Sequence, residues 1–235
     1  HLPDGTECWY MPTDIKVIPL GTVALFHGYS GDKSKMLVKA YAFRRMGYNV
    51  LLADFRGSGG SPGNSTTVGY KEAAEVLSVY KYLRWYNHER IILFGSSMGA
   101  AAILRAVSVY QLPVDAIITE CPFGSMYQTV CARFGQMGVP AFPMAGLLTF
   151  WGGVENGFWA FGHKPTRYAR GIHVPTLLLW GQHDPNVSRQ ETEEIYQNLA
   201  GPKSLHIFAR AGHEITLKQD GAEWQETVSG FLNQH

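Results

Sequence analysis

Short apolar runs alternate with longer amphipathic stretches along most of the 235-residue chain. The apolar runs are short and apolar almost throughout, which is the pattern of parallel strands covered on both faces of a sheet. We predict strands at TVALF (22–26), YNVLLA (48–53), IILF (91–94), AIIT (116–119), TLLLW (176–180) and SLHIF (204–208).

Helical spacing fills the intervals between these runs. Between residues 69 and 86, for example, Ala73, Val76 and Tyr80 recur at steps of three and four, which places them on one face of a helix. The same spacing predicts helices at 34–46, 69–86, 98–110, 189–199 and 222–233. GTECWYMP (5–12) resembles an earlier strand that pairs antiparallel at the sheet edge.

The alternation of strands and helices predicts an α/β fold with a doubly wound, mostly parallel sheet flanked by helices. Functional sites in such sheets lie at the carboxyl ends of the strands. We expect a single domain over residues 1–235, because α/β domains commonly reach this size.

Residues 122–170 break the rhythm, since they are rich in glycine, aromatic residues and methionine. Their position between two predicted strands indicates a small cap, or lid, inserted over the carboxyl ends. The uncharged window from Phe134 to Val154 reaches transmembrane length, but Pro140, Pro143 and several glycines interrupt it. We interpret the window as an apolar flap over a cleft, with a membrane-contacting surface as the alternative.

Composition narrows the range of partners. With 46% hydrophobic residues the chain can bury a substantial core, and its net charge of +1 provides no field that would recruit nucleic acid. Cys8, Cys121 and Cys131 are spaced too irregularly for a disulfide scaffold or a metal site, although pairing of Cys121 with Cys131 stays open. We therefore expect a small-molecule partner, no metal and no nucleic acid, and composition leaves the oligomeric state open.

The segment Gly95-Ser96-Ser97-Met98-Gly99 fits the pattern G-x-S-x-G, and it lies between a predicted strand and a predicted helix. The central residue of so sharp a turn has a strained backbone, and the two glycines let strand and helix pass closely. Such a turn would hold the Ser97 hydroxyl above the sheet. A Gly-Ser turn that only caps a helix is the competing interpretation, so the case depends on the partners of Ser97.

A serine hydroxyl becomes a good nucleophile when an imidazole takes its proton and an acid orients that imidazole. Asp184 lies in the turn after TLLLW, and His213 follows the last predicted strand. The order Ser, Asp, His is the order found in α/β-hydrolases. We predict Ser97, Asp184 and His213 as catalytic residues, and Glu120 is the alternative acid or a group that binds a substrate amine.

These motifs, together with FHGY (26–29) and DFRG (54–57), resemble those of α/β-hydrolase-fold serine hydrolases, of the esterase and serine-aminopeptidase-like branch. The resemblance covers nearly the whole chain. It implies that the backbone N–H groups of Tyr29 and Met98 form the oxyanion hole, and that no cofactor takes part. His27 is interpreted as a hydrogen-bonded structural histidine.

The resemblance implies a carboxylesterase that cleaves small to medium acyl or aryl esters through an acyl-enzyme on Ser97. An aminopeptidase or an acyl-thioesterase with the same three residues is the alternative, and so is a non-catalytic receptor for small molecules. The aromatic cap residues either line an acyl pocket or bury the cap within itself. They are Phe142, Phe150, Trp151, Phe158, Trp159 and Phe161. For the substrate pocket we predict Phe123, Phe142, Phe150, Trp151 and Trp159.

The chain begins at His1 rather than Met, and no positively charged, apolar signal segment precedes Asp4. We expect targeting information to lie outside this fragment. A cytoplasmic location is favoured for the fragment itself, and membrane anchorage or export stays open if an N-terminal segment was removed.

Overall fold

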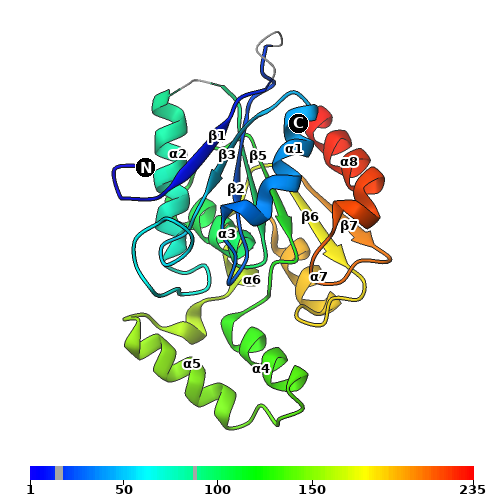
Figure 1. Ribbon diagram of the computed structural model, residues 1–235. Helices are drawn as coiled ribbons and strands as arrows, with labels where there is room; N and C mark the ends of the chain where they lie inside the picture. The colour runs from blue at the N-terminus through cyan, green and yellow to red at the C-terminus, as the bar shows by residue number, and fades with distance from the viewer. Residues whose placement is uncertain (14–17, 87–88) are drawn as a thin grey trace.

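The computed structural model describes residues 1–13, 18–86 and 89–235. Seven strands of these residues form one sheet in the order β1-β3-β2-β4-β5-β6-β7 (Figure 1). β1 pairs antiparallel with β3, and the other strand pairs are parallel. The strands are β1 (Cys8–Met11), β2 (Thr22–Phe26), β3 (Asn49–Ala53), β4 (Ile91–Ser96), β5 (Ala116–Glu120), β6 (Thr176–Gly181) and β7 (Lys203–Phe208). The predicted α/β fold and all six predicted parallel strands are confirmed.

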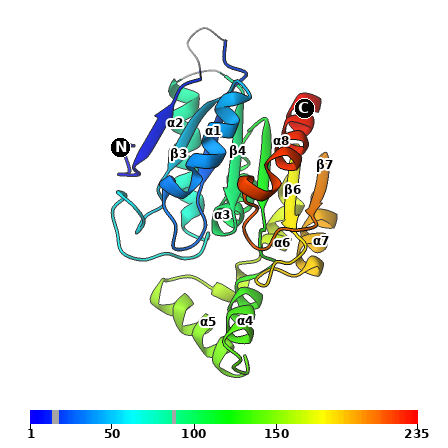
Figure 2. The same ribbon diagram turned by 45° about the vertical axis from the view of Figure 1, so that its right-hand side comes forward.

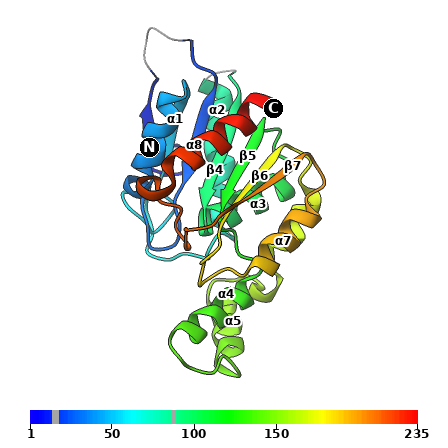
Figure 3. The same ribbon diagram turned by 90° about the vertical axis from the view of Figure 1, so that its right-hand side faces the viewer.

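Helices cover both faces of this sheet. The α-helices are α1 (Leu37–Arg45), α2 (Glu72–Tyr86), α3 (Met98–Tyr110), α4 (Met126–Gln136), α5 (Met144–Glu155), α6 (Pro165–Tyr168), α7 (Arg189–Asn198) and α8 (Leu217–Gln234). The 3-10 helices are η1 (Lys33–Met36), η2 (Ala160–Gly162) and η3 (Ala169–Gly171). Figures 2 and 3 show α1 and α8 on one face, with α2, α3 and α7 on the other.

Two buried clusters correspond to these two faces. On the α1 and α8 face, the rings of Phe43, Phe94 and Trp224 contact one another edge to face, with Phe43 and Trp224 centroids 5.3 Å apart. On the other face, Val76 of α2 and Leu104 of α3 are fully buried. The central strands are therefore apolar on both sides, which explains their continuous apolar runs.

Three predicted helices have different boundaries in the structure, and the one predicted at 69–86 begins three residues later, at Glu72. The helix predicted at 34–46 divides into η1 and α1, and the helix predicted at 222–233 begins five residues earlier, at Leu217. Asp220 interrupts α8 with non-helical dihedral angles (φ −118°, ψ 17°). Asp220 and the following Gly221 weaken helical periodicity, so the first turn was missed from the pattern.

The segment between β5 and β6 forms a helical hairpin of α4 and α5, which projects beyond the carboxyl edge of the sheet (Figure 1). Both chain termini lie in the opposite part of the molecule (Figure 1). Backbone hydrogen bonds join the two ends of the hairpin, from the Met126 N–H to the His163 carbonyl at 2.9 Å and from the Thr166 N–H to the Gly124 carbonyl at 3.3 Å. The ring of Phe158, on the returning segment, stacks on Tyr70 at 4.3 Å. Among the helices of the described residues, none combines the length and hydropathy needed to cross a bilayer.

Candidate active site

Ser97 occupies the turn between β4 and α3, with φ 50° and ψ −107°. A Cβ on Gly99 would lie 2.4 Å from the Phe26 carbonyl oxygen, and one on Gly95 would lie 2.5 Å from the carbonyl carbon of Gly99. Only glycine fits at these two positions. The Ser97 N–H donates to the Glu120 carbonyl at 2.8 Å, which fixes the strained turn to the neighbouring strand.

The three residues predicted from far-apart segments lie within hydrogen-bond distance of one another. Ser97 Oγ is 2.9 Å from His213 Nε2, and His213 Nδ1 is 2.8 Å from Asp184 Oδ2. Because a carboxylate only accepts, Nδ1 carries the proton and Nε2 is free to accept from the serine hydroxyl.

The acid of this arrangement is held rigidly. The Asp184 side chain is fully buried, and its Oδ1 accepts from the N–H groups of Asn186 at 2.7 Å and Val187 at 3.0 Å. The remaining oxygen therefore faces His213, whose side chain keeps 20% exposure at the edge of the site. This geometry can transfer a proton from Ser97 to His213 while Asp184 stabilises the resulting cation.

The loop after β2 passes next to Ser97, since a Cβ on Gly28 would lie 3.6 Å from the Ser97 Cβ. Within the part of the chain that the structure describes, neither the Tyr29 N–H nor the Met98 N–H donates to a protein acceptor. Both amides are thus available for an oxygen that gains negative charge.

His27 shapes this loop. Its Nδ1–H donates to the Gly28 carbonyl at 2.8 Å, and its Nε2 accepts from the Phe55 N–H at 3.1 Å. Burial lowers the pKa of His27, which keeps the ring neutral and preserves the accepting nitrogen. These contacts agree with the structural role predicted for His27.

Glu120 lies at the end of β5, but its carboxylate does not face the site. It forms an ion pair with Lys39 of α1 and accepts from Trp224 Nε1 of α8 at 2.9 Å, with its side chain 1% exposed. The alternative that Glu120 serves as the acid or binds a substrate amine is therefore wrong. Glu120 contributes to the turn at Ser97 through its backbone carbonyl, which accepts from the Ser97 N–H.

Cys121 is a neighbour of the site that the sequence analysis missed. It is buried with φ 46°, and its Sγ lies within 4.8 Å of a carboxylate oxygen of Asp184 and a ring nitrogen of His213. Burial, and next the Asp184 carboxylate, raise the pKa of this thiol, so it is protonated and a poor metal ligand. Cys8, Cys121 and Cys131 are all free thiols. The sequence pattern could have shown this proximity. Cys121 follows β5 and Asp184 follows β6, and these neighbouring parallel strands end at the same edge of the sheet.

The predicted pocket aromatics lie in two different environments. Phe123 is buried next to Cys121 and Trp180, whereas four cap residues are exposed. These four are Phe142 (84%), Phe150 (40%), Trp151 (61%) and Trp159 (63%). The alternative that the cap aromatics bury the cap within itself is contradicted for these four by their exposure. It is borne out in part by Phe161, which is half-buried and contacts the rings of Tyr127 and Trp159. Lining of an acyl pocket by the five residues predicted for it stays a prediction.

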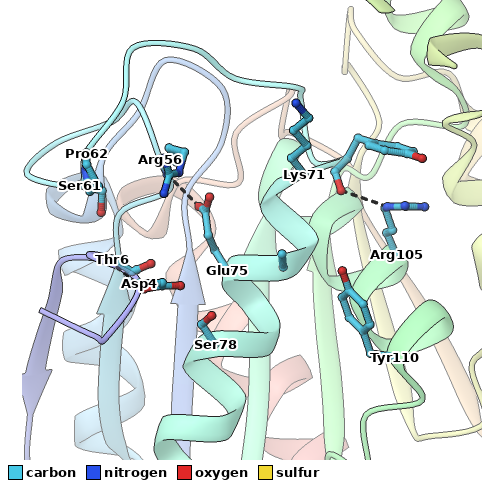
Figure 4. Close-up of a pocket in the computed structure, with 12 residues that line it drawn as sticks. Asp4, Thr6, Arg56, Ser61, Pro62, Lys71, Glu75, Ser78, Arg105 and Tyr110 are labelled. Carbon is cyan, nitrogen blue, oxygen red and sulfur yellow. Dashed lines mark hydrogen bonds between the residues drawn. The ribbon is translucent and has the colours of Figure 1, made fainter. Parts of the chain in front are cut away.

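A hollow of about 630 Å³ lies away from Ser97, along α2 and α3 (Figure 4). In it the Arg56 N–H donates to Glu75 at 2.8 Å, and Arg105 donates to the Tyr70 carbonyl at 3.0 Å. Burial raises the pKa of Glu75 to about 7. None of the predicted site residues lines this hollow.

A family model described as "Serine aminopeptidase, S33" matches residues 18–149, which is more than half of the chain. The chain belongs to this family of hydrolases. Its predicted resemblance to the serine-aminopeptidase-like branch is confirmed.

Proteins similar in sequence include two uncharacterized bacterial proteins. The chain is 27% identical to the uncharacterized protein YqkD of Bacillus subtilis over 216 residues, which cover 90% of this chain and 71% of the relative. It is 29% identical to the uncharacterized protein Rv2307c of Mycobacterium tuberculosis, over 90% of this chain and 69% of that protein.

Two solved structures have the same fold. The esterase Pf2001 of Pyrococcus furiosus superposes with a TM-score of 0.74 at 25% identity, covering 97% of this chain and 91% of that one. A monoacylglycerol lipase of Paleococcus ferrophilus superposes with a TM-score of 0.71 at 20% identity, covering 97% and 98%. The α/β-hydrolase fold of the chain is therefore shared with known hydrolases.

Proposed function

We propose that this serine aminopeptidase-family hydrolase cleaves carboxylic esters through an acyl-enzyme on Ser97. The observation that carries the proposal is the chain of two hydrogen bonds from Ser97 through His213 to the buried Asp184. Likeness to the Pyrococcus furiosus esterase at 25% identity supports an ester substrate.

In the first half of the reaction, Ser97 Oγ attacks the ester carbonyl carbon while His213 Nε2 accepts the hydroxyl proton. The amides of Tyr29 and Met98 donate to the oxygen that becomes negative, and each such donor lowers the barrier by about 3 kcal/mol. His213 then gives its proton to the departing alcohol oxygen, which leaves the acyl group on Ser97.

In the second half, water attacks the acyl carbon and His213 takes a proton from that water. Collapse of the second tetrahedral intermediate breaks the bond to Ser97 Oγ, and His213 returns the proton to the serine. Asp184 stabilises the imidazolium in both halves. The acid product leaves, and the free enzyme is restored without a cofactor.

Aminopeptidase activity is the alternative suggested by the family description. Holding a free amino terminus needs an available carboxylate near the acyl site. Glu120 is engaged by Lys39 and Trp224, so it does not serve this purpose, and Glu155 lies exposed at the end of α5. The loss of Glu120 as a candidate favours the ester substrate.

The proposal is tested with a fluorophosphonate probe and a series of p-nitrophenyl esters of increasing acyl length. We expect labelling at Ser97, located by peptide mapping, and hydrolysis that Ser97→Ala abolishes. Ser96→Ala is the matched control, since it changes the adjacent hydroxyl and should retain both labelling and turnover. Labelling without ester turnover would redirect the search to peptides and thioesters, and absence of labelling would favour a receptor.

A further inference from the structure

Cys121 is a buried titratable group that the proposed mechanism does not use. It follows β5 directly, and its side chain is fully buried. Its Sγ, a carboxylate oxygen of Asp184 and a ring nitrogen of His213 all lie within 4.8 Å of one another. The thiol is therefore a direct neighbour of both the acid and the base of the proposed reaction.

The backbone at Cys121 is strained in the same way as that of the nucleophile. Its φ is 46° and that of Ser97 is 50°, a left-handed conformation that residues other than glycine rarely adopt. The Cys121 N–H donates to the Leu179 carbonyl of β6 at 2.8 Å, so the neighbouring strand holds this conformation. Backbone strain persists where the surrounding structure fixes it, and it gathers at functional sites.

The Asp184 carboxylate has an open acceptor position. A carboxylate has about four positions at which it can accept a hydrogen bond. Within the described part of the chain, Oδ1 accepts from the N–H groups of Asn186 and Val187, and Oδ2 is 2.8 Å from His213 Nδ1. These three N–H groups leave the second acceptor position of Oδ2 for another donor.

Asp184 is the hydrogen-bond acceptor that faces the thiol proton. The Gly181 N–H also faces the sulfur, and because an N–H only donates, it does not take up that proton. Burial, and next the Asp184 charge, raise the pKa of Cys121, so the proton stays on the sulfur. The side chains that pack around the thiol are apolar, and they are Ala101 of α3, Phe123, Trp180 and Val187.

We propose that Cys121 is a positioning residue whose S–H donates to the Asp184 carboxylate and thereby sets how strongly that carboxylate stabilises the His213 cation. A thiol is a weak donor, so it fills the open acceptor position and leaves most of the negative charge to His213. Its low polarity also suits the apolar side chains around it. The inference rests on the proposed function, in which His213 accepts the Ser97 proton.

The other charged groups near the thiol stay constant when Cys121 is changed. Glu120 ends β5, and its carboxylate is paired with Lys39 of α1 on the other face of the sheet from α3. Glu214 follows His213 and is exposed. A substitution of the thiol therefore reports on its own contact with Asp184.

The test compares Cys121→Ala, which removes the donor, with Cys121→Ser, which supplies a stronger one. Protonated His213 cannot accept the Ser97 proton, so kcat/KM for a p-nitrophenyl ester falls along an acidic limb of the pH profile. We expect Cys121→Ala to raise the midpoint of this limb by about 0.5 pH unit, because more of the Asp184 charge stabilises the His213 cation. Cys121→Ser should lower the midpoint by about the same amount.

Titration of the His213 ring protons by NMR measures the same midpoint without a substrate, and the loss of the resonance in His213→Gln assigns it. This second measurement tests the hydrogen bond even if no ester is hydrolysed, so failure of the proposed function and failure of this inference are distinguishable. The matched controls are Cys8→Ala and Cys8→Ser, which change a half-buried free thiol on β1 and should keep the midpoint of the unchanged protein.

A midpoint that rises in Cys121→Ala, and is unchanged or lower in Cys121→Ser, would support the inference. A purely structural role would make the two variants shift alike or not at all, because alanine and serine fill the buried position with similar volumes. Either of these results, or a midpoint that does not rise in Cys121→Ala, would overturn the inference and leave Cys121 as a small buried apolar residue.

Discussion

Glu120 ends β5 and Asp184 follows the neighbouring strand β6, yet the two carboxyl groups have different partners. Asp184 accepts from His213 and two backbone N–H groups, whereas Glu120 is paired with Lys39 and Trp224 beneath α1 and α8. One carboxylate is therefore expected to determine turnover, and the other is expected to determine stability.

Asp184→Asn should lower kcat for a p-nitrophenyl ester by roughly 10³- to 10⁴-fold, because the amide no longer stabilises the His213 cation or its tautomer. Glu120→Gln should leave kcat within a few-fold but lower the free energy of unfolding by about 3 kcal/mol, because Lys39 loses a buried counter-ion. Steady-state kinetics and urea unfolding measure the two effects. The acid assignment fails if Glu120→Gln costs more turnover than Asp184→Asn.

At the scale of the elements, the turn from β4 to α3 depends on close approach of two backbones. Gly99→Ala should lower the free energy of unfolding by at least about 2 kcal/mol, since its Cβ would lie 2.4 Å from the Phe26 carbonyl oxygen and would separate β2 from α3. Ester turnover should also fall about 100-fold, because Ser97 and the Met98 amide would shift.

Gly146→Ala in α5 is the matched control for this change. Nothing lies within 4 Å of a Cβ at Gly146, so alanine should stabilise the helix by about 0.5–1 kcal/mol through its better helix propensity. Circular dichroism during urea unfolding would report both variants. Equal stability of the two would contradict the tight packing inferred for the turn.

Some elements could be predicted from the sequence better than others. The strands and the turn at Ser97 were predictable, because both depend on local patterns of apolar residues and glycines. The cap aromatics were not, because the pattern identifies Trp151 and Trp159 as apolar without showing whether another surface covers them. Likewise, the sequence left Glu120 open as an acid, because its role depends on Lys39 and Trp224, which are distant in the chain.

For the molecule as a whole, one buried group, His163, and one half-buried group, Glu75, give the stability opposite dependences on pH. His163 is buried at the base of the cap, where it donates to the Val68 carbonyl at 3.0 Å, and burial lowers its pKa from 6.5 to about 4. The unfolded chain therefore binds more protons, and this contribution is lost as the pH falls from 6.5 toward 4. For Glu75, burial raises the pKa from 4.5 to about 7, so the folded chain binds more protons and stability is lost as the pH rises through this range.

Between pH 4.5 and 6.5 these two slopes should nearly cancel, since each is about 1.4 kcal/mol per pH unit. Glu75→Gln removes the opposing slope, so its free energy of unfolding should fall on acidification more steeply than that of the unchanged protein. His163→Gln, which can still donate to Val68, should show the reverse tendency and gain stability relative to the unchanged protein as the pH falls. Urea unfolding at several pH values measures these differences, and subtraction of the unchanged protein removes the contribution of all other groups. Parallel curves for the three proteins would show that neither His163 nor Glu75 changes its protonation on unfolding in this range.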